Sequence, residues 1–282
     1  MKKEQRAEKM IRMISTVLDM KKEMEKSHVG AYAAQSAYFI MLSFLPLIIL
    51  LLSVIQFTGI GKADLYHLIQ EVVPLGFQSW LFGIIDEMYS RTVATVSISA
   101  LVTVWSSGKS FMALNRGMNA ICHVEKRQNY FQMRLRGAVF AILFVLLIAA
   151  TLLLIVFGTS IHELFAVYFP FLAIFTRIIL SFRMVLMLAL FTFYFALLYM
   201  VLPSRRAGFI DQLPGALFAA AGWYLFSYGF SIYIEYSHAF NMYGSLTTLV
   251  LLMFWLYFVM YIVLIGMELN YWREEQMTGI RW

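Results

Sequence analysis

Long apolar stretches without charged residues occupy most of the chain between Val29 and Ile265. The first of them runs without a charge from Val29 to Gly61, whereas a helix needs only about 20 residues to cross the hydrocarbon core of a bilayer. Polar segments that carry most of the Lys and Arg residues separate these stretches. The pattern predicts an all-α integral membrane protein with several membrane-spanning helices.

Six stretches have the length and apolar character of a transmembrane helix. We predict spans at about residues 31–57, 93–114, 137–158, 178–202, 214–234 and 245–269. They form a single transmembrane domain over residues 29–272, followed by a short cytoplasmic tail at residues 273–282. Five or seven spans would break the alternation of charge between the two sides of the membrane.

Two further segments are predicted to be amphipathic helices rather than spans. Residues 1–28 combine Lys and Arg with apolar residues at helical spacing, which is typical of a helix on the cytoplasmic membrane surface. Docking to a partner protein is the alternative. Residues 61–91 form an outer segment with apolar positions on both sides of Pro74, and the pattern leaves open whether this segment is interfacial or re-entrant.

The distribution of positive charge predicts the orientation of the spans. With six spans, eighteen Lys and Arg residues lie on the side of both termini and four lie on the opposite side. Loops rich in Lys and Arg remain in the cytoplasm, so we expect both termini to be cytoplasmic. The formal net charge of +6 then follows from topology and does not indicate a nucleic-acid partner.

Composition supports the same class of protein. Hydrophobic residues make up 61% of the chain and charged residues 13%, against about 25% charged residues in a typical soluble domain. Cys122 is the one cysteine in the sequence, which excludes an intrachain disulfide.

No pattern in the sequence points to catalysis, a cofactor or a metal site. Gly108, Lys109 and Ser110 resemble the end of a phosphate-binding loop, but Thr103 stands where that motif requires glycine. The five histidines are not spaced to converge on a metal ion, and no nucleophile has an obvious base beside it. We therefore expect a protein that is not an enzyme and has no cofactor.

Polar residues in or near the spans are the candidate contacts for a lipid or another anionic substrate, because each is costly in a membrane. Simpler roles stay open for them, namely snorkelling to headgroups, interfacial solvation, or an ion pair of Glu268 with Lys109 or Arg116. The candidates are Lys109, Arg116, Asn119, Arg177, Arg183, Glu268 and Asn270. No acidic residue lies deep enough in a predicted span to suit a proton relay, so transport would be passive or would need a partner.

A second set of residues is predicted to shape the helices. Pro46 lies in the middle of the first span and would kink it near Leu42; this kink would serve either as a hinge or as static packing. Pro214 and Gly215 begin a small-residue face in the fifth span, with Asp211 before it as a cap. Tyr243, Gly244 and Ser245 lead into the sixth span.

Ten short segments, in this order, resemble the YihY/BrkB family of bacterial inner-membrane proteins, once mislabelled as ribonuclease BN. The resemblance covers about residues 28–272, and Ile121-Cys122 departs from the tyrosine-containing stretch expected there. The segments are Ala33–Phe39, Ser43–Pro46, Trp105–Gly108, Met118–Ala120, Glu125–Arg127, Leu202–Arg206, Leu213–Ala216, Tyr243–Leu246, Trp255–Tyr257 and Gly266–Asn270.

The resemblance implies a six-helix protein of the bacterial plasma membrane whose function is poorly settled. Members have been associated with serum resistance and envelope lipid handling, and transport has been proposed for them. Our leading hypothesis is a transporter-like protein acting on a lipid or other anionic amphiphile, with membrane lipids as partners. The alternative is a non-transporting scaffold or assembly factor with envelope protein partners or a homo-oligomeric state. Ribonuclease activity finds no support in the residues.

Overall fold

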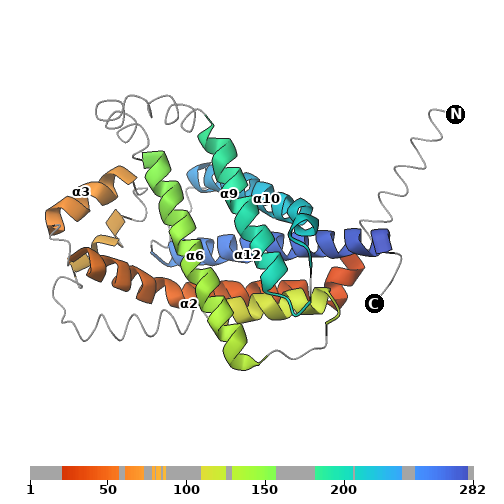
Figure 1. Cartoon of the computed structure of the whole chain (residues 1–282). Helices are drawn as coiled ribbons and strands as arrows, with labels where there is room; N and C mark the ends of the chain where they lie inside the picture. Colours follow the sequence, from red (N-terminus) through yellow and green to blue (C-terminus); the bar gives the residue numbers. More distant parts are fainter. Residues whose placement is uncertain are drawn as a thin grey trace, which may run out of the picture.

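The fold is observed in a computed structural model of the chain (Figure 1). It describes residues 21–56, 61–72, 78–79, 81–83, 85–86, 109–124, 129–156, 182–205, 207–236 and 245–278. Within these ranges every regular element is an α-helix, which confirms the predicted all-α class. The second predicted span lies mostly outside the described residues, as do residues 1–20 of the amphipathic N-terminal segment.

Six helices carry labels in Figure 1. They are α2 (Val29–Gln56), α3 (Lys62–Val72), α6 (Tyr130–Val156), α9 (Arg183–Val201), α10 (Phe209–Tyr236) and α12 (Ser245–Thr278). Residues 21–26 and 109–121 are also helical. In the part of the chain that the structure describes, four helices are long and apolar enough to cross a membrane, over Tyr130–Ile148, Arg183–Val201, Phe209–Ile234 and Leu249–Gln276. The uncharged α2 has 28 residues, a length of about 42 Å.

Several helices begin or end away from the expected residues. The fifth begins at Phe209 instead of Pro214, so Pro214 lies inside α10 and Asp211 lies in its first turn. The third begins at Tyr130 and the sixth continues to Thr278, and residues 109–121 remain helical past residue 114. Hydropathy marks the apolar part of a helix, whereas backbone hydrogen bonding continues into its polar ends.

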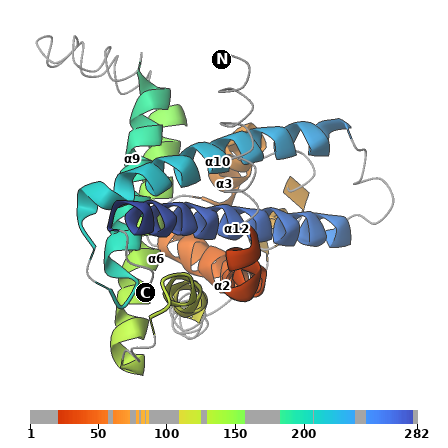
Figure 2. The same cartoon turned by 90° about the vertical axis from the view of Figure 1, so that its right-hand side faces the viewer.

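α12 lies at the centre of the arrangement, in contact with α2 on one side and α10 on the other. α9 packs against both α10 and α6. In both cartoon views α6 and α9 run steeply across α2, α10 and α12 (Figures 1 and 2). The end of α9, the start of α10 and the second half of α12 meet at one place, as the contacts of Tyr199 with Val263 and of Gly215 with Gly266 show.

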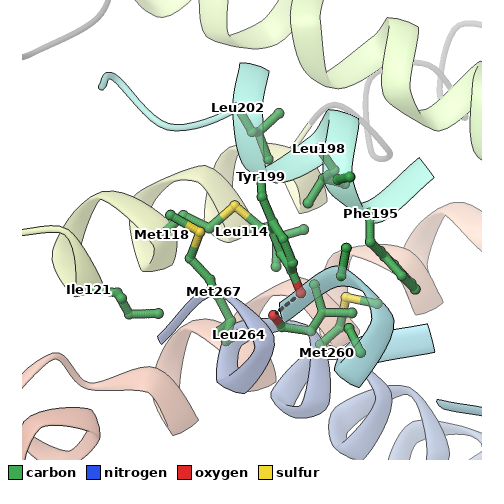
Figure 3. Close-up of a cluster of buried hydrophobic side chains, with 14 of the residues drawn as sticks. Leu114, Met118, Ile121, Phe195, Leu198, Tyr199, Leu202, Met260, Leu264 and Met267 are labelled. Atoms are coloured by element: carbon green, nitrogen blue, oxygen red, sulfur yellow. Dashed lines mark hydrogen bonds between the residues drawn. The ribbon is translucent and has the colours of Figure 1, made fainter. Parts of the chain in front are cut away.

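The hydrophobic core fills this crossing point. Side chains from residues 109–121, α9 and α12 converge there (Figure 3). The Tyr199 hydroxyl is fully buried and donates a hydrogen bond of 2.6 Å to the carbonyl oxygen of Val263. The fully or almost fully buried members include Met118, Ile121, Phe195, Leu198, Leu202, Leu264 and Met267.

Two glycines allow α10 and α12 to touch through their backbones. A Cβ atom added at Gly266 would lie 2.6 Å from the carbonyl oxygen of Gly215, and one added at Gly215 would overlap the carbonyl oxygen of Gly266. Backbones can approach this closely only where both residues lack a side chain. Gly215 therefore packs against Gly266, a partner that the sequence does not reveal.

Pro46 does not end the first helix, because α2 continues from Val29 to Gln56. One turn before it, the Ser43 hydroxyl donates a hydrogen bond of 2.8 Å to the carbonyl oxygen of Ile40. The outer segment begins with the amphipathic α3, whose Leu65 and Ile69 are buried. Tyr243 and Gly244 lie outside the described residues, and Ser245 is the first residue of α12.

Candidate functional site

Buried polar side chains gather where four segments of the chain meet. We call this region the polar junction and define it by the side chains of Asn115, Asn119, Ser204, Arg205, Gln212, Glu268, Asn270, Tyr271 and Glu274, with Glu23 and Ser27 beside it. Asn115, Gln212, Glu268 and Asn270 are each no more than 2% exposed. Buried polar groups need hydrogen-bond partners. The contacts of each residue therefore show which of its polar atoms bind other parts of the protein and which have no protein partner.

Two asparagines hold the turn between α9 and α10. The Asn115 side chain donates a hydrogen bond to the carbonyl oxygen of Leu202. The Asn119 side chain accepts one of 2.7 Å from the backbone N–H of Ser204, and donates one of 2.6 Å to Asn115. Asn119, a candidate lipid contact from the sequence, is thus used to position residues 202–205.

Asn270 supplies hydrogen-bond partners to the backbone of α10 beside Pro214. Proline cannot donate a helix hydrogen bond, and its ring disturbs the preceding turn. The Asn270 side chain accepts a hydrogen bond of 2.7 Å from the N–H of Gly215 and donates one of 3.0 Å to the carbonyl oxygen of Gln212. It also donates one of 3.1 Å to the Gln212 side chain. Asn270 therefore links α12 to the start of α10.

Arg205 is the cation of the polar junction. Its side chain is 12% exposed, its Nη1 atom donates to the Glu274 carboxylate, and its guanidinium lies 5.7 Å from the ring centre of Tyr271. Its Nε and Nη2 atoms are buried without a protein partner. A guanidinium presents donors in a planar fork that matches phosphate and carboxylate groups, so two donors of this fork remain available.

Glu268 is buried inside the protein. The residue is 2% exposed, and its Oε2 atom has no hydrogen-bond partner in the protein. Within the described residues it forms no ion pair with Lys109 or Arg116. The ion-pair role considered for Glu268 is therefore wrong in this structure. Packing of α12 against neighbouring helices buries the carboxyl.

Cys122 and His123 border the polar junction at the end of the helix formed by residues 109–121. Burial raises the pKa of the Cys122 thiol to about 12, although the charge of Arg205 opposes the shift. The His123 imidazole lies 3.3 Å from a carboxylate oxygen of Glu23 and packs edge-on against the ring of Tyr271. The buried thiol is therefore unreactive, while the histidine lies at the exposed rim.

None of the other candidate contacts that the structure describes is one of these buried polar side chains. Lys109 begins the helix of residues 109–121 with its ammonium 5.4 Å from the ring centre of Phe39, and Arg116 is exposed on the same helix. Arg183 is exposed at the first residue of α9, about 27 Å along that helix from the polar junction. Arg177 lies outside the described residues.

The polar junction retains hydrogen-bonding capacity that the protein does not use. Eight buried side-chain atoms in the described residues lack a protein partner. The sequence interpretation missed Arg205, Gln212 and Ser204, because it attributed the Arg205 charge to topology. A signal was present in the polar residues that follow Leu202 and precede Pro214. The eight atoms belong to Ser27, Ser36, Ser204, Arg205, Gln212, Glu268 and Tyr271.

No group of three or more His, Cys, Asp or Glu side chains that could hold a metal ion occurs in the ranges that the structure describes. Among the described residues, the polar junction offers hydrogen-bond donors, the Arg205 guanidinium, and buried carboxyl and amide groups. This set can bind and orient a polar group.

Helices with this length and apolarity, crossing around a buried polar junction, define an integral membrane protein of the all-α class. Comparison with known families specifies the class further. The chain belongs to the Virulence factor BrkB family, whose model matches residues 20–281.

Named relatives are similar over most of their length. The ribonuclease-like protein YfkH of Bacillus subtilis is 26% identical over 240 residues, which cover 84% of this chain and 87% of the relative. A UPF0761 membrane protein of Aliivibrio salmonicida is 27% identical over 266 residues, which cover 91% of this chain and 82% of the relative. No solved structure matches this chain.

Proposed function

We propose that this protein is a transporter-like membrane protein that handles a lipid or another anionic amphiphile of the bacterial cell envelope. In this proposal it spans the plasma membrane six times, has both termini in the cytoplasm and has no enzymatic activity. The relatives named as membrane proteins and the apolar helices support the membrane class. The proposal for the substrate rests on the polar junction.

The observation that carries the proposal is the pair of unused donors on Arg205. An Arg side chain buried near apolar helices is costly, and such residues generally mark functional sites in membrane proteins. Glu274 pairs with one edge of the guanidinium, and the ring of Tyr271 lies against one of its faces. The remaining Nε and Nη2 donors suit a bidentate contact with a phosphate oxygen pair.

Neighbouring groups add to this donor set. The Gln212 side-chain nitrogen and the Ser204 hydroxyl are also buried without a protein partner. Gln212 lies in the first turn of α10, where backbone N–H groups and the helix dipole favour an anion. Arg116 on the exposed face of the helix of residues 109–121 would attract anionic headgroups toward this region.

The test is native mass spectrometry of the full chain in mild detergent, with the co-purifying lipid identified. We expect one class of anionic lipid at fixed stoichiometry, lost on Arg205→Gln. Arg273→Gln is the matched control, since Arg273 is exposed on α12 beside Glu274. Because Arg205→Gln also removes the cation that pairs with Glu274, the double variant Arg205→Gln/Glu274→Gln removes both charges together and should lose the lipid as well.

The alternative function, a non-transporting scaffold, predicts a different result. Bulk lipid in bulk proportions, unchanged in all three variants, would contradict lipid handling by the polar junction. If deletion of residues 1–27 then abolished the function of the protein while its bound lipid stayed unchanged, docking of partner proteins by the N-terminal segment would be favoured.

A further inference from the structure

We propose that Glu268 is a proton-binding site, reached from the aqueous side through Glu23 and His123. The observation that carries this inference is the burial of an acid without a counter-charge. Glu268 is 2% exposed, and no hydrogen bond or ion pair to it occurs in the part of the chain that the structure describes. Among the acidic residues of the described ranges, Glu268 is the buried one.

The groups that face Glu268 do not neutralise an ionised carboxylate. The carboxylates of Glu23 and Glu275 lie within its electrostatic range, one from residues 21–26 and one from its own helix. Cys122 and Tyr271 are the other titratable groups in range. The nearby cation from the α9–α10 turn, Arg205, already pairs with Glu274. From α10, the one acidic residue of the first turn is the exposed Asp211.

An ionised carboxylate in such surroundings loses its hydration and gains neither an ion pair nor a hydrogen bond. The neutral acid avoids this cost. Acidic residues in membrane segments that lack a permanent partner commonly serve as proton carriers. The geometry of Glu268 therefore fits a group that holds a proton while α12 is packed as observed, and releases it when that packing opens.

A route for the proton is present on one side of Glu268. His123 and Glu23 lie 3.3 Å apart, and their side chains are 39% and 31% exposed. Both can exchange protons with water, and Glu23 is within electrostatic range of Glu268. A proton taken from water by His123 or Glu23 passes to the Glu268 carboxylate and returns by the same groups, with no other bond made or broken.

Proton release would act on packing. With Glu268 ionised, like charges on Glu268, Glu23 and Glu275 repel, and α2, which follows the segment that carries Glu23, lies against α12. Ionisation therefore loosens the N-terminal segment from α12, whereas protonation closes it. This coupling would supply the energy source that the sequence interpretation does not find. That role rests on the proposed transport function, whereas proton binding itself does not.

Infrared spectroscopy of the full chain in lipid nanodiscs tests the inference, because a neutral carboxylic acid has a carbonyl band separate from that of a carboxylate. We expect a neutral-acid band at neutral pH that disappears in Glu268→Gln and persists in Glu275→Gln. A wild-type spectrum without this band, or one that Glu268→Gln leaves unchanged, overturns the proposal.

A second variant keeps the test decisive if Glu268→Gln does not fold. Glu23→Gln removes a neighbouring negative charge at a partly exposed position, so the neutral-acid band should then disappear at a lower pH than in the wild type. An unchanged pH dependence would overturn the proposal. Lipid retention measured on the same samples separates this result from the fate of the proposed function.

Discussion

Asn270 shows how a single polar side chain can serve the fold in a membrane protein. Its amide group joins Gly215 and Gln212 at the point where Pro214 interrupts the hydrogen bonding of α10. Little water is available in such a place to satisfy the free backbone groups. The residue that satisfies them is 55 positions away in the chain from Gly215, so no local pattern could have shown the pairing.

Replacement of Asn270 by leucine is expected to destabilise the protein by about 3 kcal/mol, because two backbone groups of α10 lose their partners and each buried unpaired group costs roughly 1–3 kcal/mol. Thermal unfolding in detergent measures the change. Gln276→Leu, at an exposed position of α12, is the control and should have little effect. Equal midpoints for the two variants would contradict the role assigned to Asn270.

The thiol of Cys122 provides a test at the same scale. Burial raises its pKa to about 12, and the thiolate is the reactive form. At neutral pH we expect alkylation of the native protein to be slower than alkylation of the unfolded chain by a factor of about 100 or more. This factor follows from the smaller fraction of thiolate in the native protein. Mass spectrometry after timed quenching measures both rates, and rapid native labelling would refute the observed burial.

At the scale of elements, the contact of α10 with α12 depends on glycine. Gly215→Ala would place a methyl group onto the carbonyl oxygen of Gly266, and we expect a loss of at least about 3 kcal/mol or failure to fold. Gly229→Ala in the same helix meets no atom within 4 Å and should stabilise α10 by up to about 1 kcal/mol. Comparison of thermal midpoints tests both, and a harmless Gly215→Ala would show that the helices do not touch there.

The outer segment contains a pH-sensitive contact. Asp86 accepts a hydrogen bond from Tyr66 and pairs with Lys62. The hydrogen bonds from Lys62 and Tyr66 hold the pKa of Asp86 below its usual range. A carboxyl with a depressed pKa stabilises the folded state above its unfolded pKa of about 3.9, and this contribution disappears as the pH falls through the folded pKa.

We therefore expect α3 to lose protection on acidification below about pH 4. Hydrogen exchange of residues 62–72 measures the protection, and Asp86→Asn should lower it at neutral pH and remove its acid dependence. The pKa values of Lys62 and Tyr66 are raised by the same contact, so protection should also fall above about pH 10. A flat response across both ranges in the wild type would contradict the contact.

Hydropathy was sufficient to predict that the helices exist, but not to predict the residues at which they begin and end. The predicted spans overlap α2, α6, α9, α10 and α12, because apolar length dictates membrane insertion. The position of Pro214 was misjudged, since a proline near a helix start ordinarily marks the first turn. Here α10 begins five residues earlier at Phe209, and the partner that permits this, Asn270, belongs to another helix.

At the scale of the whole molecule, the sequence indicated the class of protein but did not show which segments meet at the polar junction. The exposed apolar side chains along α6 include Leu135, Val139, Ile142 and Leu146, as expected for a helix that faces lipid. The polar junction could not be predicted, because its residues belong to separate segments of the chain that approach only through tertiary packing. Of the candidate contacts, Asn119, Glu268 and Asn270 lie in this junction, whereas Arg183 lies at the far end of α9.

The central claim, that the polar junction handles an anionic amphiphile, is tested most directly in reconstituted vesicles. Fluorescent phosphatidylglycerol and phosphatidylcholine would be followed separately with a membrane-impermeant quencher, with and without a pH gradient. The account predicts that the protein makes inner-leaflet phosphatidylglycerol accessible, leaves phosphatidylcholine protected, and loses this activity in Arg205→Gln but not in Arg273→Gln. Accessibility equal to that of protein-free vesicles for both lipids, under both conditions, would contradict it.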